Sequence, residues 1–446
     1  MRRKIKQNIR FSNLQIVALG YGVMILLGTG LLLLPIASNQ ATTWMEALFT
    51  AVSASCVTGL VVVDTATHWT LFGQLIILLL IQIGGLGFMT FAVGLLLVLR
   101  RRVRLRYREV MVESINSSRV GNVLQITKQI IAGTVFFESI GACLLSLAFI
   151  PVYGLGKGLY FGIFHSISAF CNAGFDLMGE AEPFSSLTYW RGNALVNLTV
   201  LALIVIGGLG FLVWEDIRKK TWHWRRYQLQ TKVVLTVSGF LLFGGAGLFL
   251  LFEWGRWEMP SGEKILAALF QAGTCRTAGF NTVEIANLSE AGKVWSMVLM
   301  FIGGSPGSTA GGIKTTTIAV LLLYVFAVVR HEQEAHFFGR STEKDVLQKA
   351  VTVCMMHLLL LFSGALLICF LQPAFSATDV FFETISAVST VGMTAGLTGQ
   401  LSAASRGIIA FLMYCGRVGS ISFAVAVLEK RARPPVTFPK EKITIG

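Results

Sequence analysis

The sequence predicts an all-α integral membrane protein built from four tandem repeats around a central pore. Only 13% of the 446 residues are charged and 54% are hydrophobic, whereas soluble chains carry about 25% charged residues. Apolar runs of about 20 residues, the length that crosses a hydrocarbon core about 30 Å thick, recur along the chain. Shorter apolar pieces alternate with them, so each repeat is expected to contain a spanning helix, a pore half-helix, a glycine turn and a second spanning helix.

Eight long apolar segments are expected to be the spanning helices. They cover residues 14–36, 71–99, 130–152, 194–213, 233–252, 294–329, 346–371 and 408–428. Four shorter pieces lie between the members of successive pairs, at residues 44–57, 159–172, 264–276 and 379–390. These pieces cannot cross a bilayer and are expected to be re-entrant. The four predicted repeats cover residues 1–110, 111–226, 227–340 and 341–446.

The net charge of +14 is explained by membrane topology. If the short pieces enter and return, both termini share one side with the loops that join successive pairs, and most of the 37 Lys and Arg lie on that side. An excess of Lys and Arg marks the cytoplasmic side, so both termini of this multi-pass protein are expected to be cytoplasmic. The basic runs are therefore interpreted as topology determinants of a protein surrounded by membrane lipid, and no nucleic-acid partner is expected. The seven Cys lie in apolar or near-apolar segments and predict no disulfide framework.

Each short piece ends in a similar glycine-containing string. The strings are Val57-Thr58-Gly59, Asn172-Ala173-Gly174, Thr277-Ala278-Gly279 and Thr390-Val391-Gly392. Irregular backbone at membrane depth is tolerated only where protein buries it or where it lines a watery cavity. Glycine permits backbone angles that aim carbonyl oxygens inward together, and rings of carbonyls can replace the water shell of a cation. The four turns are therefore expected to line a pore for a monovalent cation, which the half-helix C-termini also favour.

Close helix packing is the alternative explanation for any one of these glycines. Four glycines at matching places favour the pore, because packing contacts need not recur at every repeat. A second glycine-rich landmark recurs downstream, at residues 84–88, 207–211, 303–305 and 416–419. We interpret that second landmark mainly as close helix packing.

These strings and their spacing resemble those of the Trk/Ktr/HKT superfamily of potassium transporters, most closely the Ktr-type membrane subunit, over essentially the whole chain. In that superfamily, glycine at the selectivity position of each filter string goes with potassium selectivity, and serine in the first repeat marks sodium-preferring members. All four strings here carry glycine, so the resemblance implies potassium uptake across the plasma membrane. The backbone carbonyls expected to bind the ion are those of Thr58, Asn172, Thr277 and Thr390.

The resemblance also implies partners that the residues alone do not show. It implies a homodimer docked on a cytosolic RCK-type regulatory ring that binds ATP or ADP, with no nucleotide on this chain. Sodium is a candidate activator. The short basic cytoplasmic loops leave no room for a regulatory domain within the chain itself.

The sixth predicted span contains an interruption. Five Gly, one Pro and small hydroxyl residues break the helix and leave a polar loop at mid-membrane, which must face the cavity below the filter. We expect a flexible plug here, and the resemblance implies that this loop, residues 303–314, is the gate. The predicted gate residues are Gly303, Gly304, Ser305, Pro306, Gly307, Ser308, Thr309, Ala310, Gly311, Gly312 and Lys314, with Arg417 from the last span.

Arg417 replaces a glycine of the second landmark in the middle of an apolar segment. An intramembrane charge is a functional hypothesis by default, so Arg417 is expected either to raise the barrier for cations below the filter or to anchor the loop through its carbonyls. The structural alternative is an ion pair with Glu138. Arg276 and Asn172 are expected to brace the filter from behind. Glu383 and Glu46 are candidates for outer-vestibule attraction or for capping.

Two other functions remain as alternatives. A secondary transporter of another cation or solute would need ionisable residues in its binding site, and the spans hold few beyond Glu138 and Arg417. An intramembrane hydrolase is suggested by the G-x-S-x-G pattern around Ser305, with His357 as its histidine, but that motif needs a preceding strand. A phosphate-binding loop is disfavoured because Ile313 separates Gly312 from Lys314. The chain is therefore not expected to be an enzyme.

Overall fold

The computed structural model describes residues 12–99, 123–221, 223–332, 336–341 and 344–419. This part of the chain is helical, apart from two two-residue strands, β1 (His336–Phe337) and β2 (Arg340–Ser341), which pair antiparallel. The expected all-α membrane architecture is confirmed. The predicted repeat boundary between residues 110 and 111 lies outside the described residues, as does the basic loop around it.

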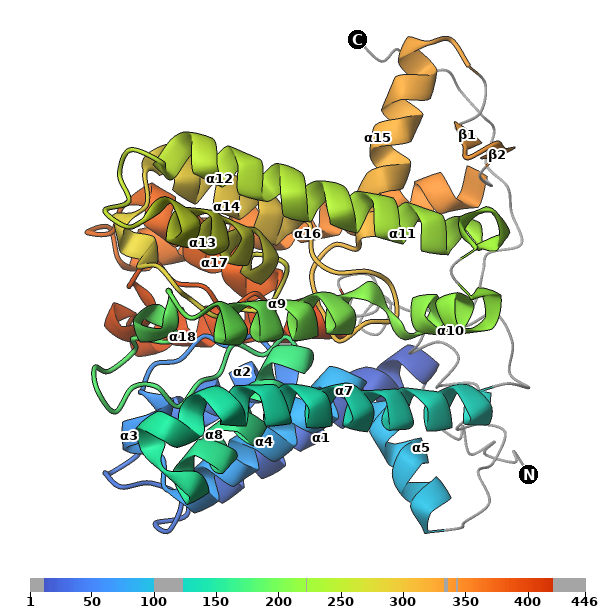
Figure 1. Cartoon of the computed structure of the whole chain (residues 1–446). Coiled ribbons are helices and arrows are strands. Elements are labelled where there is room, and N and C mark those ends of the chain that lie inside the picture. The colour runs from blue at the N-terminus through green and yellow to red at the C-terminus, as the bar shows by residue number, and fades with distance from the viewer. Residues whose placement is uncertain (1–11, 100–122, 222, 333–335, 342–343, 420–446) are drawn as a thin grey trace, which may run out of the picture.

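Each repeat begins with a long helix. These are α1 (Asn13–Leu32), α7 (Val123–Tyr153), the continuous run of α11 (Leu229–Gly239), the π-helical turn η4 (Phe240–Gly244) and α12 (Gly245–Glu253), and α16 (Lys344–Leu371). These four helical runs of the described chain are long and apolar enough to cross a membrane. Large apolar side chains such as Leu26, Phe240 and Phe370 are exposed on them, as expected of surfaces that face lipid. Figure 1 shows these helices running roughly parallel through the molecule.

The four short pieces form half-helices, as predicted. They are α2 (Trp44–Cys56), α8 (Leu155–Phe170), α13 (Ser261–Thr274) and α17 (Ala377–Val388), called pore helices below. Glu46 forms a capping box with Thr43 at the start of α2, which is the capping role among its two expected roles. The last three residues of every pore helix are buried, so the four ends converge inside the bundle.

The second helix is bent sharply in repeats 1 and 2. In repeat 1, α4 (Leu71–Leu86) meets α5 (Phe88–Val98) at an angle of 97°, and in repeat 2, α9 (Ala194–Leu209) meets α10 (Phe211–Lys220) at 92°. The prediction of one continuous helix over 71–99 and over 194–213 is therefore wrong. Gly87 and Gly210 stand at the bends with φ of +83° and +95°, a conformation that glycine adopts at little cost.

The second helices of repeats 3 and 4 differ from this pattern. In repeat 3 the predicted interruption separates α14 (Glu290–Phe301) from α15 (Thr315–Val329). In repeat 4, α18 (Ala403–Val418) ends at Gly419, and the expected continuation to residue 428 lies outside the described residues. If each bent pair counts as one span, the described part holds up to six helices able to cross by length and composition. Figure 1 shows α5 and α15 projecting away from the bundle.

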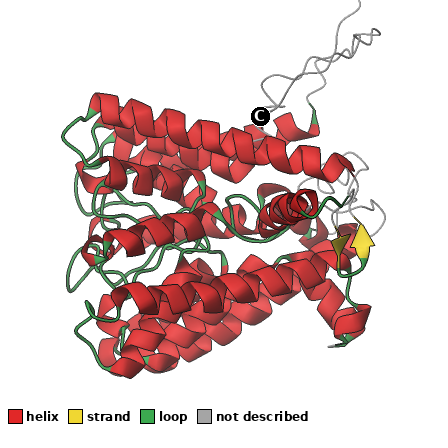
Figure 2. Ribbon diagram, turned by 90° about the horizontal axis from the view of Figure 1, so that it is seen from above, coloured by secondary structure: helices red, strands yellow, loops and turns green. Residues whose placement is uncertain are grey.

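Short helical turns connect the longer elements, and loops gather at one end of the bundle (Figure 2). The turns are α3 (Thr65–His68), η2 (Thr188–Trp190), η3 (Trp224–Arg226), η5 (Ile285–Asn287) and η6 (Thr398–Gln400). Two large clusters of buried apolar side chains fill the bundle, one mainly in repeats 1 and 2 and the other mainly in repeats 3 and 4. Both clusters reach residues at the pore-helix ends, so the core supports the glycine strings directly.

Candidate functional site

The four glycine strings share one backbone conformation. Each has two residues with positive φ separated by one ordinary residue. The first members have φ between +51° and +65°, and they are Val57, Asn172, Thr277 and Thr390. The second members have φ between +68° and +94°, and they are Gly59, Gly174, Gly279 and Gly392. Positive φ costs a non-glycine residue about 1–2 kcal/mol, so the same strained turn recurring four times indicates a conformation that the site requires.

The four glycines form a closed ring. A Cβ placed on Gly174 would lie 2.6 Å from the carbonyl oxygen of Ala278, and one on Gly279 would lie 2.5 Å from that of Val391. Equivalent contacts join Gly59 to the Ala173 carbonyl and Gly392 to the Thr58 carbonyl. Each string therefore touches the next around one axis, in the order of the repeats, and the fourth touches the first. No side chain fits at these four positions without displacing the neighbouring backbone.

The ring also fixes the register of the carbonyls. By conformation, Val57 is the counterpart of Asn172, Thr277 and Thr390. Thr58 instead belongs with Ala173, Ala278 and Val391, because these four carbonyls each meet the glycine of a neighbouring string. The expected set of Thr58, Asn172, Thr277 and Thr390 therefore mixes two layers. Aligned on their glycines, the strings already place Val57 opposite Asn172, Thr277 and Thr390, so the expectation of Thr58 departed from that alignment.

Hydroxyl side chains on the pore helices hold the strings in place. Ser53 and Ser386 accept hydrogen bonds from the amides of Gly59 and Gly392, each at 3.1 Å. Ser168 and Thr274 donate to the carbonyls of Phe175 and Phe280, each at 2.7 Å. All four hydroxyl residues are buried. Sequence reasoning missed them, although one hydroxyl residue shortly before each filter glycine is a repeating signal that could have identified them.

Other buried hydroxyl groups at the strings have no hydrogen-bond partner among the described residues. They include Oγ1 of Thr58, Thr277 and Thr390 and Oγ of Ser55 and Ser389. A buried hydroxyl group without a partner costs about 1–3 kcal/mol. Water or a partly dehydrated cation in the ring would satisfy such groups, so the donors and acceptors present fit a hydrated ion path.

The second glycine landmark packs beneath the pore helices. Cβ atoms on Gly84, Gly207 and Gly416 would collide with the carbonyl oxygens of Ser55, Phe170 and Val388, respectively, at the ends of their own pore helices. These glycines permit close approach of two backbones, which is the packing role expected of them. In repeats 1 and 2 the same landmark also contains the bends described above.

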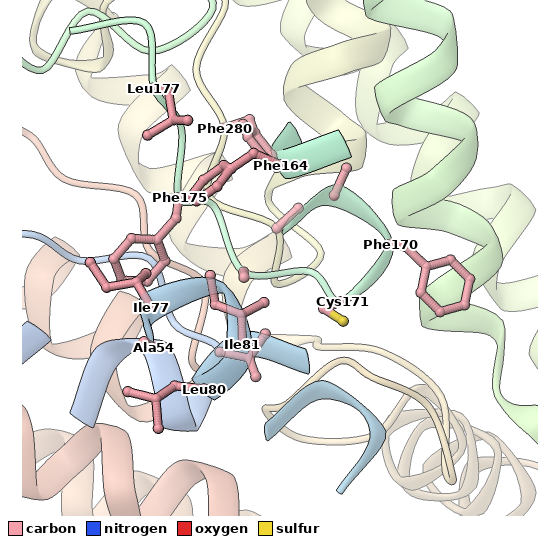
Figure 3. Close-up of a cluster of buried hydrophobic side chains, with 14 of the residues drawn as sticks. Ala54, Ile77, Leu80, Ile81, Phe164, Phe170, Cys171, Phe175, Leu177 and Phe280 are labelled. Atoms are coloured by element: carbon pink, nitrogen blue, oxygen red, sulfur yellow. The ribbon is translucent and has the colours of Figure 1, made fainter. Parts of the chain in front are cut away.

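Apolar side chains from three repeats interlock behind the ring. Figure 3 shows Phe164, Phe175 and Phe280 gathered above Ala54 and Ile77, and each of these side chains is at most 1% exposed. Densely packed interiors resist displacement of individual groups. The packing therefore holds the strings against outward movement.

The interrupted segment of repeat 3, residues 303–314, lies against the ring and is called the loop below. Gly311 is so close to Thr390 Oγ1 that a Cβ could not be accommodated. Thr309 donates its hydroxyl hydrogen to the carbonyl of Phe170 or to Oδ1 of Asn172, at 3.2 and 3.3 Å. The loop therefore contacts the strings of repeats 2 and 4, which are opposite members of the ring.

Backbone bonds attach the loop to the bend of repeat 2. Ser305 and Thr309 donate their amides to Gly208 and Gly207 at 3.0 and 3.3 Å, and Phe211 donates to Gly307 at 2.7 Å. The Lys314 ammonium donates to the carbonyls of Ala310 and Gly311 within the loop, at 2.7 and 3.4 Å. The remaining predicted gate residues, Gly303, Gly304, Pro306, Ser308 and Gly312, lie in the same segment.

Arg417 joins three repeats. From α18 its guanidinium donates to the carbonyl of Thr309 in the loop and to those of Gly84 and Gly85 at the bend of repeat 1. Among the described residues no carboxylate forms an ion pair with it. Glu138, the alternative partner, accepts hydrogen bonds from Gln82 at 3.0 and 3.3 Å instead. Of the expected arrangements, the geometry matches anchoring through loop carbonyls.

Hydrogen bonds connect Arg276 and Asn172 with each other and with a neighbouring helix. Arg276 donates to the Ser238 hydroxyl on α11 at 2.9 Å, and its own carbonyl accepts a hydrogen bond from Nδ2 of Asn172 at 3.2 Å. Glu383 is fully buried and accepts hydrogen bonds from Thr394 and Thr398 in the segment after the string of repeat 4. A solvated attractor in an outer vestibule would be exposed, so the burial of Glu383 does not support that expectation.

The hydrolase pattern does not assemble in the described part of the chain. The Ser305 hydroxyl forms a hydrogen bond with the Thr315 hydroxyl at 3.2 Å, and no hydrogen bond links it to a histidine or a carboxylate there. His357 instead meets the Phe301 ring edge-on. A nucleophile elbow requires a base within hydrogen-bond reach of the serine.

Comparison with known proteins places the chain in a family. Residues 2–431 match the family TrkH, described as a cation transport protein. The potassium/sodium uptake protein NtpJ of Enterococcus hirae is 38% identical over 100% of this chain and 99% of its own length. The Ktr system potassium uptake protein B of Bacillus subtilis is 37% identical over 99% of each chain. The crystal structure of the potassium transporter TrkH from Vibrio parahaemolyticus shares the fold, with a TM-score of 0.73 over 96% of this chain and 87% of that one at 19% identity. The chain therefore belongs to the TrkH family of cation transport proteins.

Proposed function

We propose that this protein carries out potassium uptake across the plasma membrane, with the four-glycine ring as its selectivity filter. The closed ring of backbone, with matched positive φ values in all four repeats, is the observation that carries the proposal. A ring of carbonyls can replace the hydration shell of a cation. Relatives named as potassium uptake proteins support potassium as the ion.

Two carbonyl layers are the proposed ion ligands. One consists of Val57, Asn172, Thr277 and Thr390, and the other of Thr58, Ala173, Ala278 and Val391. The pore helices end just before these layers, and their partially negative C-termini favour a cation there. Ions would move down their electrochemical gradient without a chemical step, so no residue is proposed to act in catalysis.

The loop at residues 303–314 is the proposed gate. It lies against the filter strings of two repeats, and the Arg417 guanidinium, a fixed positive charge, holds its Thr309 carbonyl. A cation leaving the filter would meet that charge, so Arg417 contributes to the barrier as well as to anchoring. Opening requires the loop to exchange these hydrogen bonds for contacts with water or ions.

Regulation and assembly complete the proposal. A relative named as a Ktr system protein supports a multi-component system, and we propose a homodimer on a cytosolic RCK-type ring that binds ATP or ADP. Both termini are proposed to be cytoplasmic, with repeats bounded at residues 110, 226 and 340. Sodium is proposed as an activator or as a second transported ion, since one relative is named a potassium/sodium uptake protein.

Ion uptake into liposomes that hold the purified chain tests the function. Uptake of rubidium-86 as a potassium tracer is measured with and without competing sodium, and with and without a nucleotide-binding ring from a Ktr system. Potassium-preferring uptake that requires the inserted chain is the expected result. If neither ion is taken up with the nucleotide-binding ring present, the proposal is refuted and the solute-transporter alternative is favoured instead.

A further inference from the structure

Two pore helices carry a buried polar side chain at matching positions. His165 on α8 and Glu383 on α17 precede the filter glycines of repeats 2 and 4 by the same number of residues. Both side chains are fully buried. Because each string touches the next in the order of the repeats, repeats 2 and 4 lie opposite one another across the ring. His165 and Glu383 therefore occupy one diagonal of the filter.

His165 fastens the segment that follows the filter in repeat 2. Its Nδ1 lies 2.7 Å from the carbonyl oxygen of Phe161, and its Nε2 lies 3.3 Å from the amide nitrogen of Leu177. A carbonyl can only accept and an amide can only donate, so these partners require a neutral ring with its proton on Nδ1. The rings of Phe149 and Phe164 meet the imidazole edge-on at 5.5 and 6.0 Å, which fixes its orientation.

Glu383 fastens the segment that follows the filter in repeat 4, with a carboxyl group in place of an imidazole. The Thr398 hydroxyl lies 3.1 and 3.0 Å from its two carboxylate oxygens, and the Thr394 hydroxyl also donates to it. Both threonines follow the filter glycine Gly392 in sequence.

In repeats 1 and 3, which form the other diagonal of the filter, the residue at the matching pore-helix position makes no such hydrogen bond among the described residues. The matching residues are Thr50 in repeat 1 and Phe270 in repeat 3. Thr50 Oγ1 has no hydrogen-bond partner among the described residues, and phenylalanine has no acceptor. The fold therefore accommodates a hydroxyl or a ring here, and packing alone does not require an imidazole or a carboxylate.

We propose that His165 and Glu383 are positioning residues that hold the outer ends of two opposite filter strings and thereby maintain ion selectivity. This inference rests on the proposed function. The two residues fasten the chain on the far side of the filter glycines from the pore-helix ends. Loss of either acceptor frees the outer end of one string and widens the ring along one diagonal, which weakens the distinction between ions of different size.

Four substitutions test the role through the ratio of potassium to sodium uptake in liposomes. His165→Phe introduces the residue type found in repeat 3, and Glu383→Met keeps the approximate length of the side chain but leaves only a weak thioether acceptor. Each should lower the ratio by about tenfold, the effect associated with losing one hydrogen bond to a charged or buried polar group. His165→Gln and Glu383→Gln each retain an acceptor oxygen and should restore most of the ratio.

Thr50→Val is the matched control and should leave the ratio unchanged, because its hydroxyl has no partner to lose. A wild-type ratio in folded His165→Phe and Glu383→Met proteins would overturn the proposal, as would an equal fall in the two Gln variants. If His165→Phe and Glu383→Met do not fold, Thr398→Val provides a second test, because it removes a donor from Glu383 with little change in shape. It should lower the ratio of potassium to sodium uptake about threefold, and an unchanged ratio refutes the positioning role. Absence of selective uptake in the wild type would instead refute the proposed function.

Discussion

Serine in place of Gly59 should abolish most of the selectivity of the filter. Gly59 has φ of +94°, and a Cβ on it would lie within 3.0 Å of the Ala173 carbonyl oxygen, a separation that real Cβ atoms essentially never show. It would also lie 3.1 Å from Gly174 Cα. The substitution therefore strains its own backbone and displaces a carbonyl of the neighbouring string.

The size of the effect follows from these two contributions. Positive φ costs a residue with a Cβ about 1–2 kcal/mol. Carbon and carbonyl oxygen approach to about 3.3 Å at closest, so Ala173 must retreat by at least about 0.3 Å. If the ring relieves this strain by widening, potassium loses its advantage over sodium by about tenfold, since 1.4 kcal/mol corresponds to a factor of ten.

Potassium and sodium uptake by liposomes with equal amounts of folded protein provides the assay. Gly22→Ser in α1 is the matched control, because a Cβ there meets nothing within 4 Å. A Gly59→Ser protein that is inserted, folded and as selective as the wild type would refute the reasoning that the closed glycine ring sets selectivity.

Three further predictions concern the gate and the outer loops. Arg417→Gln removes the guanidinium bonds to the Thr309 and Gly84 carbonyls and should raise potassium uptake without the regulatory ring several-fold. Arg406→Gln, on the same helix with a half-buried side chain that reaches Gly399, should leave that uptake unchanged, and an unchanged rate in Arg417→Gln would contradict the anchoring role. Gly311→Ala forces a Cβ against Thr390 Oγ1 and should lower the thermal unfolding temperature by a few degrees. Adding Thr390→Ala should restore part of this loss, and additive losses in the double variant would show that the two sites do not touch. Burial lowers the pKa of His68, in the connection before α4, below its ordinary value of 6.5, even though Glu46 and Asp64 oppose the shift. The folded state therefore binds fewer protons than the unfolded state, and the stability of the protein should fall as the pH drops below 6.5. Unfolding temperatures measured between pH 8 and pH 5 should depend less on pH in His68→Gln than in the wild type, and an equal dependence would argue against His68 as the source.

The sequence predicted the parts of the fold that depend on segment length and repetition. The pore-helix ends at Cys56, Phe170, Thr274 and Val388 lie close to their expected positions, because a glycine string followed each short apolar piece. The bends at Gly87 and Gly210 were not predicted. Hydropathy averages side-chain properties and contains no information on backbone direction, so a bent pair and a straight helix give the same apolar run.

The site was predicted by residue type more readily than by register. Aligning the strings on their glycines was sufficient to identify all four. The same alignment places Val57, and not Thr58, with Asn172, Thr277 and Thr390, and the backbone angles agree with that register. Ser53 and its counterparts were missed because hydroxyl residues are common in membrane helices, where they often bond to their own backbone. His165 and Glu383 gave no common sequence signal, since their chemistry differs and only their geometry is shared.

The hydrogen bonds around Thr309 connect the gate to the filter. Its amide donates to Gly207, its hydroxyl lies within reach of Asn172 Oδ1, and its carbonyl accepts from Arg417. Asn172 in turn donates to the carbonyl of Arg276 beside the filter string of repeat 3. Every polar group of Thr309 thus has a partner in another repeat. If the loop leaves, Asn172 Oδ1 loses the Thr309 hydroxyl, while Asn172 Nδ2 keeps the Arg276 carbonyl.

Movement of the gate therefore removes a hydrogen-bond donor from the side chain of a filter residue. Packed interfaces of this kind have discrete arrangements and do not deform continuously. Because a free-energy coupling between two sites is reciprocal, an ion that stabilises the filter with Asn172 in place also stabilises the loop in its observed position. Thr309→Val removes the link while keeping the shape of the side chain. It should make the rate of gate opening independent of which ion occupies the filter, and opening that still differs between potassium and sodium in this variant would show that another contact carries the coupling.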